Sequence, residues 1–106
     1  MGLFDMFMPK DINKGVEECA GTSGAVLLDV RTVQEYEDGR IPGAVNIPLQ
    51  QIERAGKQIP DKETPLFVYC YSGARSSQAV SALKSMGYTK VRNIGGISDY
   101  TGSKEV

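Results

Sequence analysis

Two continuous apolar runs set the strongest constraint on the fold of this 106-residue chain. Residues 25–30 read AVLLDV and residues 66–70 read LFVYC, and neither run alternates apolar with polar side chains. Runs of this length and composition are typical of strands that are buried on both faces of a parallel sheet. The two runs therefore predict a sheet that other elements cover on both sides.

The segments between and around these runs predict helices and shorter strands. Thr32 and Glu35 match a capping box, so a short helix should begin there and end at Gly39. The remaining pattern predicts helices over 11–21, 49–55 and 75–86, strands over 44–47 and 90–94, and a last helical turn over 97–100. Strands that alternate with helices through short connections predict an α/β fold with a mainly parallel sheet.

Length predicts a single domain over residues 1–106, since domains cluster near ~100–150 residues. We expect its core to span about 9–101 and to follow a short apolar N-terminal segment, 1–8. Residues 3–8 of this segment favour a first strand over the alternative of a docking tail. This segment is a poor signal peptide, and no apolar stretch approaches the ~20 residues of a membrane span. We therefore expect a cytoplasmic protein with no membrane partner and with reduced thiols.

The absence of histidine excludes several kinds of chemistry. There can be no Ser-His-Asp triad, no Cys-His pair and no histidine metal ligand, and two cysteines alone cannot complete a structural zinc site. We therefore expect no metal. A formal net charge of −1 also argues against a nucleic-acid partner, which usually selects a basic surface.

Cys70 is the most informative candidate, because it ends a buried strand and precedes a helix. The intervening loop would direct backbone N–H groups toward an anion, Gly73 permits the turn, and Arg75 adds a positive charge. Each of these neighbours favours a thiolate, which would ionise Cys70 without a general base. The alternative is that Cys70 is a small buried apolar residue. Cys19, on the inner face of the first helix, could pack in the core or act as a resolving thiol.

Four segments in this order match one known pattern: Asp29-Val30-Arg31, Glu35-Tyr36, GRIPGAVNIP over 39–48 and CYSGARS over 70–76. The chain closely resembles the single-domain rhodaneses, which are thiosulfate sulfurtransferase-like proteins, and Gly95-Gly96 is similar to that family's C-terminal segment. The resemblance implies a mostly parallel five-stranded sheet with helices on both faces. It also implies a sulfurtransferase that carries sulfur as a persulfide on Cys70 and needs no cofactor.

The resemblance assigns an anion-binding loop around the nucleophile and two supporting residues. Asp29 and Arg31 would support the site, more by tying the strand end to the next loop than by touching substrate. Tyr71 could flank the substrate or pack over the loop. The loop residues are Tyr71, Ser72, Gly73, Ala74, Arg75 and Ser76.

Neither Tyr71 nor Ser72 is charged, whereas some thiosulfate-using members have a second cation near the cysteine. This makes a persulfide an alternative donor to thiosulfate. We expect a monomer that uses a small-molecule donor and acceptor, and a protein relay partner is left open.

Two other functions remain open at this stage. The same fold could serve as a non-catalytic interaction or regulatory module, although the intact cysteine and arginine argue against it. A cysteine-dependent phosphatase is disfavoured, because related phosphatases have a Cys-x5-Arg loop shaped around a tetrahedral oxyanion. This chain has the shorter Cys70-x4-Arg75, which suits a single sulfur atom better.

Overall fold

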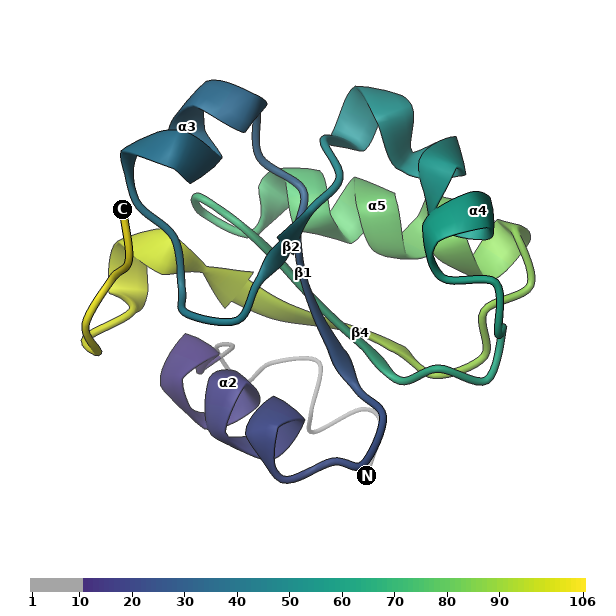
Figure 1. Cartoon of the computed structure of the whole chain (residues 1–106), viewed down its shortest axis with the longest axis horizontal. Helices are drawn as coiled ribbons and strands as arrows, with labels where there is room; N and C mark the ends of the chain where they lie inside the picture. The colour runs from purple at the N-terminus through teal and green to yellow at the C-terminus, as the bar shows by residue number, and fades with distance from the viewer. Residues whose placement is uncertain (1–10) are drawn as a thin grey trace.

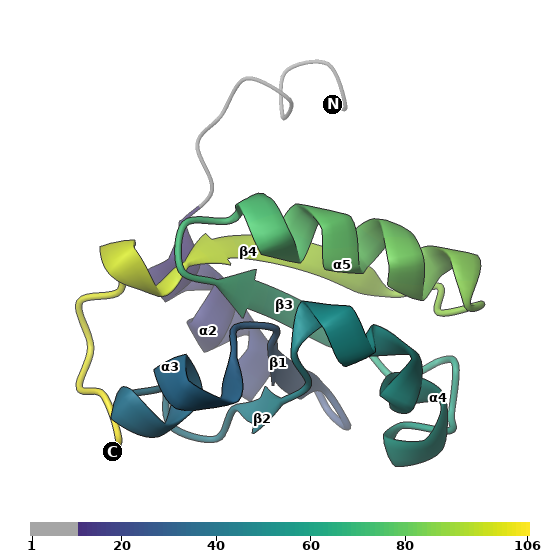
Figure 2. The same cartoon turned by 90° about the horizontal axis from the view of Figure 1, so that it is seen from above.

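The computed structural model of the chain describes residues 11–106, so the strand expected over 3–8 lies outside the described residues. Within the described part, a parallel sheet of four strands has the order β2-β1-β3-β4. The five-stranded sheet implied by the resemblance is therefore wrong for these residues. The parallel α/β fold is confirmed, and helices lie on both sides of the sheet (Figure 1, Figure 2).

The two apolar runs form the centre of the sheet as β1 (Val26–Asp29) and β3 (Leu66–Cys70). The strand order places β2 (Val45–Asn46) and β4 (Val91–Gly96) at the edges. All five residues of β3 are buried, as expected for a strand with neighbours on both sides and helices on both faces. Because every pairing is parallel, the carboxyl ends of all four strands lie along one edge of the sheet.

Helices α2 (Ile12–Ala20), α3 (Val33–Asp38) and α5 (Ala74–Ser85) lie close to their predicted positions. The capping box of Thr32 and Glu35 is present at the start of α3. The segment predicted as one helix over 49–55 is instead a 3-10 helix η1 (Leu49–Arg54) that continues into α4 (Ala55–Gln58). A further 3-10 turn, η2 (Ile97–Asp99), follows β4. The strand β4 continues through Gly96, beyond its predicted end at residue 94, because Gly95 and Gly96 pair with Tyr69 and Cys70 of β3.

The sheet separates two hydrophobic cores. Successive side chains of β3 point to opposite faces, so Val68 and Cys70 pack beside Ala79 and Leu83 of α5 in one core. Phe67 and Tyr69 pack in the other core, which α2 covers together with residues before β2 and after β4. Figure 2 shows α2 and α5 on the two sides of the sheet.

The chain after η2 crosses the carboxyl edge of the sheet and returns to α3, and we call residues 101–105 the C-terminal strap (Figure 2). Thr101 donates backbone and hydroxyl hydrogen bonds to Asn13 Oδ1 of α2, at 3.0 and 3.3 Å. Glu105 and Arg40 exchange two backbone hydrogen bonds of 2.8 and 2.9 Å. The strap is thus fixed at both ends. None of the helices within residues 11–106 has the length and apolar character required to span a bilayer.

Candidate active site

The Cys70 sulfur lies at the carboxyl end of β3, where the backbone turns directly into α5. The residue is 1% exposed. Its Sγ accepts a hydrogen bond from the Gly73 backbone N–H at 2.9 Å and lies 3.4 Å from Ser76 Oγ. The loop therefore places an N–H group and a hydroxyl group next to the sulfur, although the strand that carries Cys70 is apolar.

Gly73 gives the loop its curvature. Its φ of +105° lies in the left-handed region, where glycine is favoured, and it precedes the first residue of α5. No side chain caps α5, so the backbone N–H groups at its start are free to face an anion. The sulfur of Cys70 takes that position, as the sequence predicted from the order strand, tight loop and helix.

Burial and hydrogen bonding act on the Cys70 thiol in opposite directions. Burial alone would raise the pKa of Cys70, but hydrogen bonds from the Ser76 hydroxyl and from the backbone N–H groups of Ser76, Gly73 and Ser72 bring it below the ordinary value. Cys19 has no such partners, and burial raises its pKa. Only Cys70 is therefore prepared for nucleophilic chemistry.

Asn93 of β4 holds the loop in place, and sequence reasoning missed it. Its Nδ2 donates to the Gly73 carbonyl at 3.0 Å, while its Oδ1 accepts from Ser76 Oγ at 2.8 Å and from the Gly95 N–H at 3.0 Å. The β3–β4 register shifts at this point, where Asn93 pairs with Val68 but Gly95 pairs with Tyr69. This bulge re-aims the backbone so that the Asn93 amide can reach across to the loop.

Gly96 makes room for the loop. A Cβ built on Gly96 would lie 2.6 Å from Ser72 Cα and in still closer conflict with the Tyr71 carbonyl oxygen. The Ser98 N–H donates to that same carbonyl at 3.1 Å. The end of β4 and the start of η2 therefore form a wall that fixes residues 71 and 72. The Gly95-Gly96 pair was the available signal, but the sequence alone did not place it against Cys70.

Arg75 is paired with Glu35 rather than free. Its two terminal nitrogens donate to the two carboxylate oxygens of Glu35 at 2.7 and 3.0 Å. Hydrogen bonding to Arg75 and the Thr32 groups lowers the pKa of Glu35 to about 2, against a smaller opposing effect of burial. The ion pair connects the start of α3 to the start of α5, so Arg75 supports the loop while Glu35 balances its charge. Sequence reasoning quoted Glu35 in a motif but did not assign it this role.

Asp29 and Arg31 form a buried ion pair at the end of β1. Arg31 Nη2 donates to Asp29 Oδ2 at 2.7 Å and to the Gly39 carbonyl at 2.8 Å. Asn46 Nδ2 donates to the backbone carbonyls of Asp29 and Arg31, both at 3.0 Å. These contacts tie the end of β1 to β2 and to the turn after α3. The supporting role of both residues in the site stays a prediction.

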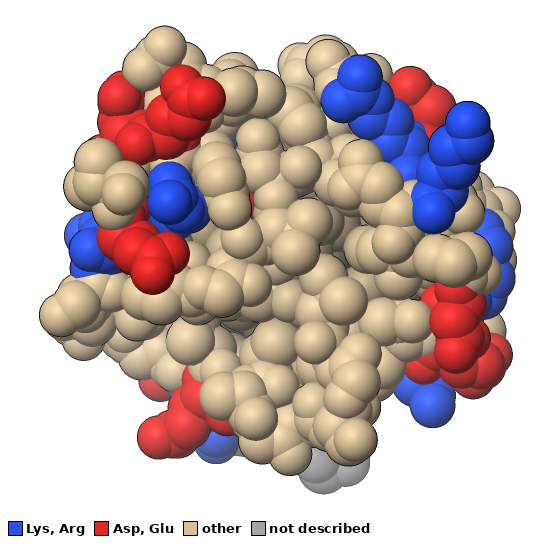
Figure 3. All heavy atoms as spheres, viewed as in Figure 1, with Lys and Arg blue, Asp and Glu red and all other residues tan. Residues whose placement is uncertain are grey.

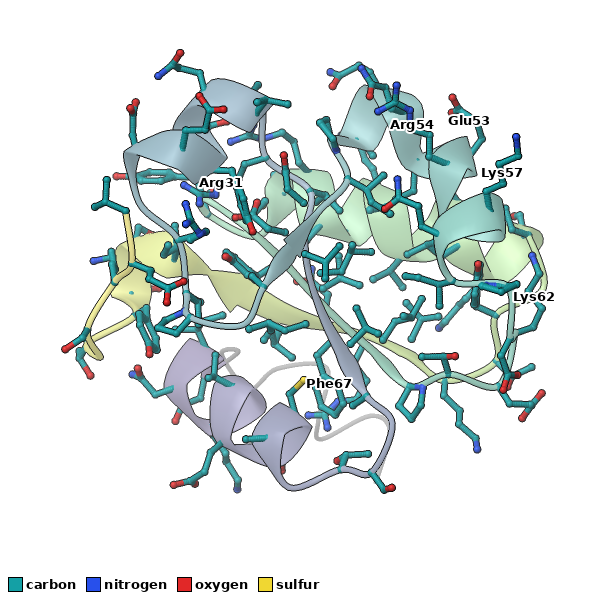
Figure 4. The ribbon with its side chains drawn as sticks, viewed as in Figure 1. Arg31, Glu53, Arg54, Lys57, Lys62 and Phe67 are labelled. Atoms are coloured by element: carbon teal, nitrogen blue, oxygen red, sulfur yellow. The ribbon has the colours of Figure 1, made fainter. Side chains whose placement is uncertain are left out.

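An open pocket of about 450 Å³ lies beside the loop, at the carboxyl edge of the sheet. Tyr71, which is 55% exposed, contributes one side of it. The other lining residues come from the end of β1, from α3, from η2 and from the strap: Arg31, Glu35, Asp38, Gly39, Ile97, Ser98 and Lys104. Figure 4 shows Arg31 below α3, and Figure 3 shows side chains of both charges gathered on this side of the molecule, next to a broad uncharged surface.

The described residues contain no group of three His, Cys, Asp or Glu side chains that could hold a metal ion. The chemistry available at this site is that of one activated thiol in a ring of N–H donors. This arrangement, on a parallel α/β sheet with a Cys-x4-Arg loop, defines a class of small domains that act through a cysteine.

The chain belongs to the Rhodanese-like domain family, whose model matches residues 9–103. It is 44% identical over 73 residues to thiosulfate sulfurtransferase PspE of Escherichia coli (strain K12), and the aligned region covers 68% of this chain and 70% of that protein. It is 39% identical over 80 residues to the putative sulfur carrier protein YrkF of Bacillus subtilis (strain 168), covering 74% of this chain but only 43% of that protein.

A solved structure of rhodanese with anions from E. coli has the same fold. It superimposes with a TM-score of 0.71 at 40% identity, over 76% of this chain and 96% of that one. The resemblance inferred from the sequence motifs is therefore confirmed at the level of the family.

Proposed function

We propose that this protein is a rhodanese-type sulfurtransferase in which Cys70 carries the transferred sulfur. The Cys70 thiolate attacks the outer sulfur of thiosulfate and forms a new S–S bond. The S–S bond of the donor breaks, and sulfite leaves with the electron pair. An acceptor thiolate, or cyanide in an assay, then takes the outer sulfur from the persulfide and regenerates the thiolate. This is covalent two-step catalysis, and it needs no cofactor.

The observation that carries this proposal is the position of Cys70 Sγ, 2.9 Å from the Gly73 N–H at the uncapped start of α5. The same N–H groups that lower the pKa of the thiol can stabilise negative charge on the persulfide sulfur. A chain without histidine has no imidazole to remove the thiol proton, so this electrostatic activation replaces a general base.

The names of two relatives indicate the class of donor. Thiosulfate is the first candidate, because the E. coli relative is named for it, and a low-molecular-weight or protein persulfide is the second. The name of the B. subtilis relative as a putative sulfur carrier supports a relay in which a partner protein receives the sulfur. We propose that the chain works as a monomer in a reducing compartment such as the cytoplasm, because the reaction requires a free thiol.

Replacement of the nucleophile tests this function. The Cys70→Ser variant should keep the fold and lose sulfur transfer from thiosulfate to cyanide, because a hydroxyl cannot hold the sulfur as a persulfide. Intact wild-type protein incubated with thiosulfate should gain the mass of one sulfur atom on the peptide that contains Cys70, and Cys70→Ser should gain none.

The matched control is Cys19→Ser, which removes the other thiol and should keep both the mass gain and the activity. Sulfur transfer by Cys70→Ser at the rate of the wild type would contradict the proposal. A wild-type protein that gains no sulfur from thiosulfate or from any persulfide would favour a non-catalytic module of the same fold.

A further inference from the structure

We propose that Lys104, on the C-terminal strap, binds the sulfonate end of thiosulfate and so determines the use of this anionic donor. The inference rests on the proposed sulfurtransferase function and assigns it a donor-binding residue. It also supplies the second cation that the loop sequence lacks, from a position 34 residues beyond Cys70.

The first observation is that Lys104 and Tyr71, the first residue of the loop, line one pocket. Lys104 faces the same open pocket as Tyr71, the residue that follows the nucleophile, and as Glu35, the partner of Arg75. The pocket opens at the carboxyl edge of the parallel sheet, where ligands bind in α/β folds of this kind. A small dianion in this pocket would therefore lie next to the loop that holds the sulfur of Cys70.

The second observation concerns the charges that line the pocket. Arg31 is neutralised by Asp29 at 2.7 Å, and the charge of Glu35 is balanced by Arg75 at 2.7 Å. Asp38 accepts a hydrogen bond from the neutral amide of Gln34 at 3.0 Å, which balances no charge, so Asp38 is an acidic residue of the pocket lining beside Lys104. Lys104 forms no ion pair with any of residues 11–106, so it is the lining cation whose charge is available to a ligand.

The third observation is that the strap is anchored on both sides of Lys104, so the backbone at this residue is fixed. The next residue, Glu105, exchanges two backbone hydrogen bonds with Arg40, and its carboxylate lies 3.6 Å from Arg40 Nε. Thr101 is tied to Asn13 at the other end of the strap. Lys104 lies one residue beyond the end of the family match, which covers residues 9–103.

The chemistry of the donor explains why a cation is needed there. Thiosulfate carries two negative charges and must approach a thiolate, while the positive charge of Arg75 is already balanced by Glu35. When the outer sulfur moves to Cys70, the two negative charges stay on the departing sulfite. A lysine beside the sulfonate oxygens would reduce the repulsion on approach and favour the bound dianion.

The test compares two lysine substitutions with thiosulfate as the donor and cyanide as the acceptor. Lys104→Met should raise the KM for thiosulfate roughly fivefold to tenfold with little change in kcat, and it should weaken the dependence of KM on ionic strength. Lys104→Arg should restore the wild-type KM. The matched control is Lys84→Met, in the last turn of α5, which is the end of that helix away from the loop.

A second donor separates electrostatic recognition from a structural role of the strap. Cysteamine persulfide carries an ammonium group instead of a sulfonate and gains nothing from a neighbouring cation, so its KM should not rise in Lys104→Met. Equal losses with both donors, or no change in the KM for thiosulfate, would overturn the assignment of Lys104. Wild-type protein that takes sulfur from the persulfide but not from thiosulfate would also overturn it, although the sulfurtransferase function would stand. Failure of that function would appear separately, as wild-type protein inactive with both donors.

Discussion

Ser76 has a single hydroxyl proton and three acceptors within reach. Its Oγ lies 2.8 Å from Asn93 Oδ1, 3.0 Å from the Gly73 carbonyl and 3.4 Å from Cys70 Sγ. The proton can be donated to one acceptor at a time, and the Cys70 sulfur is the strongest hydrogen-bond acceptor when it is a thiolate. Ser76 is therefore a polar side chain that can respond to the ionisation of its neighbour while it remains fully buried.

We predict that Ser76→Ala raises the pKa of Cys70, because it removes the hydroxyl group that contributes most to lowering this pKa. The thiolate is the attacking form, so activity falls as the pH drops through this pKa. The acid limb of the kcat/KM profile with thiosulfate should therefore move to higher pH in the variant. The measurement is the pH profile of sulfur transfer, accompanied by thiolate absorbance in the absence of donor.

Ser77→Ala is the control for this prediction, because Ser77 is the next residue of α5 and is exposed. Its profile should coincide with that of the wild type. An unchanged acid limb in Ser76→Ala would mean that the backbone N–H groups alone activate the thiol.

The cysteine loop could be predicted from local sequence, but the residues that support it could not. Cys70, Gly73 and Arg75 are close together in the chain, and their types indicate an anion-binding loop without any tertiary information. Asn93 and Lys104 reach the site only through the pairing of β4 with β3 and through the path of the strap. No local pattern distinguishes such residues from ordinary polar surface residues.

Among the elements, α3 is the one whose position depends most on charge. None of its residues is buried, and its start is joined to α5 by the bidentate contact of Glu35 with Arg75. Both side chains are about one-third exposed, so we expect a modest contribution to stability, although the geometry is favourable. The same carboxylate also completes the capping box.

We predict that Glu35→Gln lowers the free energy of unfolding by about 1 kcal/mol or less near neutral pH. Glutamine still fits a capping box, so the change removes mainly the ion pair. The pKa of Glu35 is about 2 in the folded protein, below its usual value. Its contribution is therefore complete above the unfolded pKa and is lost as the pH falls toward 2.

Urea unfolding of wild type and variant at several pH values measures this contribution. The two stabilities should converge as the medium becomes more acidic, and Glu35→Ala should lose more because it also removes the cap. A difference between wild type and Glu35→Gln that stays constant down to pH 2 would contradict the role of the ion pair.

The elements themselves were mostly predictable, because their signals are local. Apolar runs identified β1 and β3, and the capping box identified α3. The exceptions have tertiary causes. The strand β4 continues through Gly95 and Gly96 because β3 pairs with them, and the 3-10 geometry of η1 includes a non-helical Gln51 that no periodic pattern reveals.

For the molecule as a whole, the sheet separates the two thiols. Cys70 belongs to the core beneath α5, and Cys19 belongs to the core beneath α2, on the opposite face. The folded chain therefore cannot form a disulfide between them, since such a bond requires Cα atoms within ~7 Å and side chains directed toward each other. The core-packing interpretation of Cys19 fits this arrangement, and a resolving role does not.

We predict that Cys19→Ala retains full sulfur transfer and loses about 1 kcal/mol of stability, as expected for the removal of a small buried group. Kinetics with thiosulfate and thermal unfolding measure the two effects. Mild oxidation of the wild type followed by peptide mapping should yield no internal Cys19–Cys70 disulfide. Recovery of that disulfide from folded protein, or a loss of turnover in Cys19→Ala, would contradict the separation.

The parallel order of the strands has a consequence for how the protein acquires activity as it folds. Val26 pairs with Leu66, and Leu66 pairs with Val91, so each sheet contact closes a long stretch of chain. Such non-local pairings are slow to form, because loop closure comes before the gain from contact. The Cys70 loop needs Asn93 and Gly96 from the last strand, so a nascent chain that ends before β4 lacks the groups that hold it. Recovery of sulfur transfer during refolding therefore reports the pairing of β4 with β3, which brings Asn93 and Gly96 to the loop.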